Sequence, residues 1–121
     1  MPPEMRKAHP YHVYDAIQAQ PELIERILQK RSAIEFAADA IARKDRITLV
    51  GIGTSLHAAR VAESWMREFS AGRLEARAEQ SFELVHHPIA FTPNDAVIVI
   101  SHTGTTTASL KPCAWLAQRE R

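Results

Sequence analysis

Apolar residues in the first third of the chain recur at the spacing of amphipathic helices. The pattern predicts a short helix over residues 11–18 and further helices near 21–30 and 33–43, the last begun by a capping box at Ser32. We therefore expect residues 1–45 to form a helical arm, whose apolar stripe packs either on a following sheet or on a second copy of the chain. The stripe consists of Ile24, Ile27, Leu28, Ile34, Ala37, Ala38 and Ile41.

Beyond residue 45 the pattern changes to that of strands separated by helices. Residues 97–100 form an unbroken β-branched run, typical of a strand buried on both faces, and residues 46–50 are also rich in Ile, Leu and Val. Residues 74–78 alternate in polarity, as in a half-exposed strand at a sheet edge, and residues 81–85 suit one helical turn. This order predicts an α/β fold with a parallel sheet of about three strands.

Two of these strands lead directly into short polar turns. Gly53, Thr54 and Ser55 follow the first strand and open a helix, and a hydroxyl-rich loop from Ser101 to Thr107 follows the last. Because the carboxyl ends of parallel strands meet at one edge, we expect both turns to face one pocket. Backbone N–H groups, hydroxyls and a helix N-terminus together favour binding of a phosphate.

Composition limits the other possibilities. The chain has 121 residues and a formal net charge of +1, with charges of both signs interleaved, so we expect no nucleic-acid partner. The N-terminus lacks the apolar core of a secretory signal and no apolar run reaches bilayer length, which predicts a cytoplasmic protein with no membrane partner. The single cysteine, Cys113, excludes an internal disulfide and is expected to be a packing residue.

At the two polar turns the sequence resembles a known family. A strand followed by Gly53-Thr54-Ser55, and a second strand followed by Ser101-His102-Thr103-Gly104-Thr105-Thr106, are similar to the sugar isomerase (SIS) domain of phosphosugar-binding proteins, especially the isomerase half of the glutamine–fructose-6-phosphate aminotransferases. The segment from Val13 to Glu22 also resembles the helical lead-in of those enzymes. The resemblance implies a flavodoxin-like three-layer topology and assigns residues 46–121 to the N-terminal part of a SIS domain.

The resemblance also implies a set of ligand-binding residues. Thr54 and Ser55 would contact the sugar phosphate, and Ser101, Thr103 and Thr106 would form the phosphate cradle. Three positions depart from the family pattern: His102 replaces a Gln, Thr105 replaces a Glu and Ile52 replaces a Cys, so specificity within the family stays open. The complete expected set is Gly53, Thr54, Ser55, Ser101, His102, Thr103, Gly104, Thr105 and Thr106.

Histidines are the remaining candidates for chemistry. His102 in the loop and His57 in the first turn of a helix can each contact a sugar hydroxyl or exchange a proton near neutral pH, or else face solvent. His86 and His87 have no third ligand at a suitable spacing, so we expect no metal site. No cofactor is expected either. A dinucleotide-binding Rossmann unit is a weaker alternative, because Leu56 stands where its fingerprint needs a small residue.

The function expected from the sequence is binding of a hexose or hexosamine 6-phosphate within an isomerase or aminotransferase type of SIS protein. Family domains have five strands and their acid–base residues lie mostly beyond the part matched here, so the catalytic residues are unknown and enzymatic activity is undecided. A non-catalytic sugar-phosphate sensor and a dimerisation module stay open as alternatives. We expect a homo-oligomer, or a further C-terminal segment that completes the sheet at the exposed edge of residues 96–100.

Overall fold

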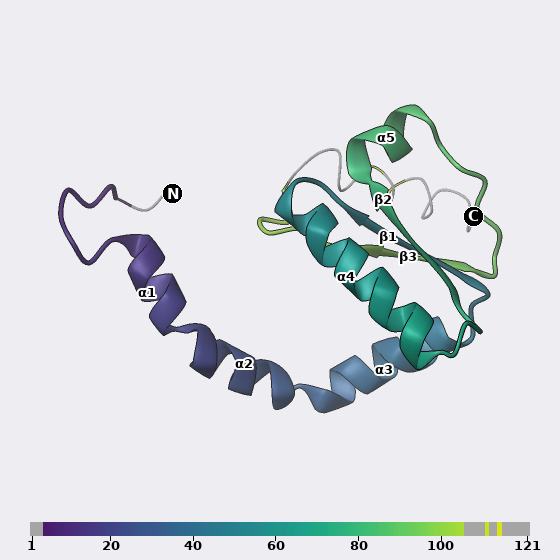
Figure 1. Cartoon of the computed structure of the whole chain (residues 1–121), viewed down its shortest axis with the longest axis horizontal. Coiled ribbons are helices and arrows are strands. Elements are labelled where there is room, and N and C mark those ends of the chain that lie inside the picture. The colour runs from purple at the N-terminus through teal and green to yellow at the C-terminus, as the bar shows by residue number, and fades with distance from the viewer. Residues whose placement is uncertain (1–3, 106–110, 112–113, 115–121) are drawn as a thin grey trace. The chain divides into compact units, whose positions relative to one another are not determined.

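The computed structural model describes residues 4–105, 111 and 114. The chain divides into two compact units, Met1–Ala38 and Asp39–Arg121. Figure 1 shows three helices followed by alternating strands and helices. The elements are α1 (His12–Gln18), α2 (Gln20–Leu28), α3 (Arg31–Ala42), β1 (Arg46–Gly51), α4 (Thr54–Phe69), β2 (Glu75–Gln80), α5 (Ser81–His86) and β3 (Asp95–Val99).

The first unit contains α1, α2 and the start of α3, as the helical spacing predicts. None of these helices has a buried residue among those described. The predicted capping box is wrong, because α3 begins at Arg31 and Ser32 lies inside the helix. Glu35 instead pairs with Arg31 one turn earlier, at 2.7 Å.

The second unit is built on a three-stranded parallel sheet in the order β2-β1-β3. This arrangement confirms the predicted α/β class, with β2 at a sheet edge. The central strand β1 is the buried one, and β3 is only half-buried along its length. The expectation of a β3 buried on both faces is therefore wrong for the described residues, whereas the expected edge at residues 96–100 agrees with the position of β3 beside β1 alone.

Helix α4 lies along one face of the sheet (Figure 1). Ile47 and Leu49 of β1 point to this face and pack with Ala59 of α4 and Ala76 of β2. All four are fully or almost fully buried. Small side chains on α4 and β2 let the helix approach the sheet closely, so the short chain obtains a dense core from few large residues.

The backbone at the end of β1 leaves no room for a side chain. A Cβ built at Gly51 would lie 2.5 Å from the carbonyl carbon and oxygen of Ser55 and 2.7 Å from the nitrogen of Leu56. This contact brings the first turn of α4 directly against the end of the strand. Gly53 then reverses the chain at φ 57°, a conformation that costs a side chain energy.

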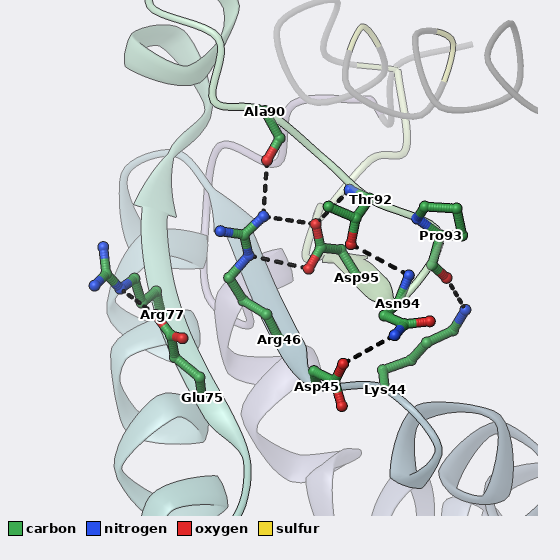
Figure 2. A network of polar contacts seen from close by, with 10 residues as sticks. All are labelled: Lys44, Asp45, Arg46, Glu75, Arg77, Ala90, Thr92, Pro93, Asn94 and Asp95. Carbon is green, nitrogen blue, oxygen red and sulfur yellow. Dashed lines mark hydrogen bonds and ion pairs between the residues drawn. The ribbon is translucent and has the colours of Figure 1, made fainter.

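A network of polar contacts fixes the opposite end of the sheet (Figure 2). Arg46, at the start of β1, donates from Nε and Nη2 to the two carboxylate oxygens of Asp95, at 3.1 and 2.6 Å. The same guanidinium donates to the carbonyl of Ala90, and the backbone N–H of Thr92 donates to Asp95. These contacts tie the segment before β3 to the start of β1.

The Asp95 side chain is only 5% exposed, whereas that of Arg46 is 31% exposed. Burial acts to raise the pKa of Asp95, but hydrogen bonds from Arg46 and Thr92 outweigh it and lower the pKa overall. A lowered pKa means that the pair stabilises the fold at pH values above the ordinary aspartate range. Its contribution disappears as the pH falls through the lowered pKa of the folded state.

Replacing Asp95 with Asn should therefore lower the free energy of unfolding at pH 7 by about 2–4 kcal/mol, because the Arg46 guanidinium loses its charged partner. The difference from wild type should begin to shrink below about pH 4, the ordinary aspartate range, and should disappear as the pH falls through the lowered pKa of Asp95 in the folded protein. Urea unfolding, monitored by circular dichroism at pH 7 and below about pH 4, measures the free energy of unfolding of both proteins.

Glu75→Gln is the matched control, because Glu75 pairs with Arg77 at 3.2 Å with both side chains more than half exposed. It should change the free energy of unfolding by less than about 1 kcal/mol. Equal effects of the two substitutions would contradict a structural role for the Arg46–Asp95 pair.

Candidate functional site

The carboxyl ends of β1 and β3 lie side by side. Val50 and Val99 are paired in the parallel register, and the backbone N–H of Ile100 donates to the carbonyl of Val50 at 2.8 Å. The chain therefore leaves both strands at one edge of the sheet, where α/β proteins commonly bind ligands.

A cavity of about 570 Å³ opens at this edge. Its polar lining comes from the two turns singled out in the sequence, and an apolar part comes from residues on three elements. The lining residues are Ile52, Thr54, Ser55, Ala58, Ile100, Ser101, His102 and Thr103.

Five of the nine expected ligand residues thus line one cavity, namely Thr54, Ser55, Ser101, His102 and Thr103. The other expected residues have different positions. Gly53 precedes α4 as its N-cap, and Gly104 and Thr105 lie further along the loop after β3. Thr106 and Cys113 lie outside the described residues.

Hydroxyl groups in the loop after β3 already accept hydrogen bonds within the loop. Ser101 Oγ accepts from the backbone N–H of Gly104 at 3.0 Å. Thr103 Oγ1 accepts from the hydroxyl of Thr105 at 2.9 Å and from its backbone N–H at 3.4 Å. A hydroxyl that accepts in this way still has its own proton to donate, so Ser101 and Thr103 can offer donors to an oxyanion.

The N-terminus of α4 adds a second group of donors. Its N-cap is Gly53, which makes no side-chain hydrogen bond to the first turn. A 16-residue helix directs the positive end of its dipole at this point, although the backbone N–H groups of Ser55 and Leu56 already donate to the carbonyls of Ile52 and Gly53. The cavity can therefore stabilise negative charge without a lysine or arginine among its described lining residues.

His57 does not line this cavity. It lies exposed in the first turn of α4, and its backbone N–H donates to the carbonyl of Gly53 at 3.4 Å. Of the two candidate histidines, only His102 lies at the site. Among the described residues, no group of three or more His, Cys, Asp or Glu side chains is arranged to hold a metal ion.

Sequence reasoning did not include the apolar part of the lining. Ala58 lies one turn beyond Thr54 on the same side of α4. Ile100 directly precedes Ser101, so its position next to the cavity could have been predicted.

A second cavity, of about 320 Å³, lies at the amino ends of the strands. Its lining carries more positive charge than that of the first cavity. Arg43, Lys44 and Arg73 contribute to its lining, at the C-terminal ends of α3 and α4. Cations there offset the negative ends of the helix dipoles, and Lys44 also donates to the carbonyl of Pro93 at 2.7 Å. These roles account for the basic side chains without a ligand.

No helix in the described part of the chain is long and apolar enough to cross a membrane. No solved structure matches the chain significantly.

Two curated relatives are similar to the chain. The isomerizing glutamine–fructose-6-phosphate aminotransferase of Pseudomonas putida is 25% identical over 112 residues, covering 85% of this chain and 18% of the relative. The enzyme of the same name from Haemophilus ducreyi is 31% identical over 74 residues, covering 61% of this chain and 12% of the relative. The chain thus spans less than a fifth of the length of either relative.

The model of the SIS domain family matches residues 40–120. This match covers β1, α4, β2, α5 and β3, together with both turns that form the cavity. The chain belongs to the SIS domain family.

Proposed function

We propose that the chain binds a phosphorylated sugar, a hexose or hexosamine 6-phosphate, in the cavity at the carboxyl ends of β1 and β3. The observation that carries this proposal is that two hydroxyl-bearing turns, far apart in the sequence, line one cavity of about 570 Å³. Ser101 and Thr103 hold the phosphate on one side, with Thr106 as the expected third hydroxyl. Thr54, Ser55 and the N-terminus of α4 hold the phosphate on the other side of the cavity.

The likeness to two isomerizing aminotransferases supports a place in an isomerase or aminotransferase type of SIS protein. No residue of this chain is assigned an acid–base role, so the proposal for the chain itself is limited to binding. A sugar-phosphate sensor would use the same cavity. Conversion of fructose 6-phosphate by the protein, followed by chromatography of the products, separates an enzyme from a sensor.

A dinucleotide site is not favoured. Leu56 stands at the third position of the dinucleotide fingerprint, where a small residue is needed for close packing of the helix on the strand. The family match accounts for the same turn.

We also propose that a second copy of the chain covers the apolar stripe of α2, whereas Ile41, at the far end of the stripe, packs against the core of the sheet. The helices of the first unit are short, α1 and α2 having 7 and 9 residues, and no residue of either is buried. Helices of this length are marginal in water without a packing partner. Ile24 and Ile27 are each more than half exposed and lie on one face of α2.

The edge of β3 is a separate place for a partner. Strand β2 forms the other side of the sheet. There the carboxylate of Glu63 accepts a hydrogen bond from the outward N–H of Ala78 at 3.0 Å, which blocks pairing with a further strand. The described residues place no such group along β3. We propose that a further strand, from a C-terminal segment of the protein, adds to the sheet at β3.

Replacing Ser101 and Thr103 together with Ala should lower the affinity for fructose 6-phosphate or glucosamine 6-phosphate by at least about 100-fold. Each hydrogen bond to a charged group contributes about 1.5–3 kcal/mol, and two are removed. Isothermal titration calorimetry measures the affinity, and circular dichroism confirms that the variant is folded.

Ser32→Ala is the matched control, because Ser32 is an exposed hydroxyl residue of α3 that does not line the cavity. It should bind as wild type does. Unchanged affinity in the folded double variant would show that the loop after β3 does not hold the phosphate.

Replacing Ile24 and Ile27 together with Ser should convert an oligomer into a monomer, because the apolar stripe of α2 loses its hydrophobic contact. Sedimentation velocity over a range of concentrations measures the mass. Phe36→Ser is the control, since Phe36 is 80% exposed and lies on the side of α3 away from the stripe. A wild-type protein that sediments as a monomer at every concentration, or a double variant that stays oligomeric, would rule out this interface.

A further inference from the structure

The cavity has an apolar side that phosphate binding does not use. Ile52 in the turn after β1, Ala58 in α4 and Ile100 at the end of β3 all line it, next to the hydroxyl-bearing residues. They come from three different elements, so their convergence on the cavity follows from the fold and not from one local sequence. Ile52 is 37% exposed, so part of its apolar surface is available to a ligand in the cavity.

This lining is poorly matched to a ring that carries only hydroxyl groups. A sugar hydroxyl pressed against Ile52 or Ile100 loses its hydrogen bond to water and gains none from an aliphatic side chain. A ligand with a methyl group at the same place instead removes apolar surface of both partners from water, which is favourable. An apolar substituent on the sugar is therefore better suited than a hydroxyl group to this side of the cavity.

A free amino group is no better suited to this part of the cavity. None of the described lining residues is an aspartate or glutamate, so an ammonium group would find no opposite charge there. An acylated amino group is neutral, and its amide can use a neighbouring hydroxyl such as that of Thr54 while its methyl group contacts Ile52.

We infer that the ligand is an N-acetylated hexosamine phosphate and that Ile52 is a residue determining specificity for its acetyl group. This inference rests on the proposed binding of a sugar phosphate in the same cavity. Ser101 and Thr103 hold the phosphate of every ligand in the class, and Ile52, Ala58 and Ile100 select among the sugars.

The test compares glucose 6-phosphate with N-acetylglucosamine 6-phosphate, two ligands of equal charge that differ in the substituent on carbon 2. Calorimetry with the full chain should show about tenfold tighter binding of the acetylated sugar, which corresponds to about 1.4 kcal/mol. In Ile52→Ser the preference should fall to about twofold or less, because the acetyl group loses its apolar contact.

Val61→Ser is the matched control, because Val61 is 49% exposed on α4 and does not line the cavity. It should keep the tenfold preference. Equal affinities of the wild-type protein for both sugars, or a preference that survives in Ile52→Ser, would overturn the inference while leaving sugar-phosphate binding in place. A folded protein that binds neither sugar would overturn the proposed function together with this inference.

Discussion

The parallel pairing of β1 with β3 is the constraint on which the candidate site depends. Because the two strands run in the same direction and in register, from Arg46 with Asp95 to Val50 with Val99, they end together at one edge. The turn after β1 and the loop after β3 then begin from adjacent points, although about 50 residues separate them in the sequence. The ion pair of Arg46 with Asp95 holds the other end of the same pairing.

The two edges of the sheet differ in a way that explains where an anion can bind. At the carboxyl ends of the strands, the N-terminus of α4 and the hydroxyl groups of Ser101 and Thr103 all favour binding of negative charge. At the amino edge, two helices end, and the cations of Arg43 and Arg73 offset their negative dipoles. Net charge is thus a poor guide to the site, because the more basic cavity is the less suitable one.

Much of this arrangement could be predicted from the sequence, because it depends on local patterns. Apolar spacing located the helices and strands, and Gly53 and the hydroxyls near Ser101 marked the turns that line the cavity. For β3 the sequence indicated both a strand buried on its two faces and an exposed edge at residues 96–100, and the half-buried β3 at the edge of the described sheet agrees with the second expectation. Ser32 was misplaced because Arg31 extends α3 by pairing with Glu35. The contact of Arg46 with Asp95 joins residues 49 positions apart, which no local pattern indicates.

The central claim is that the turn after β1 and the loop after β3 bind the same anionic ligand. Backbone amide chemical shifts during a titration with fructose 6-phosphate test this claim most directly. Assigned two-dimensional NMR spectra should show the amides of Thr54 and Ser55 shifting together with those of Ser101 and Thr103, along one saturation curve. Shifts confined to one of the two turns, or centred on Arg43 and Arg73 at the opposite edge, would contradict the account.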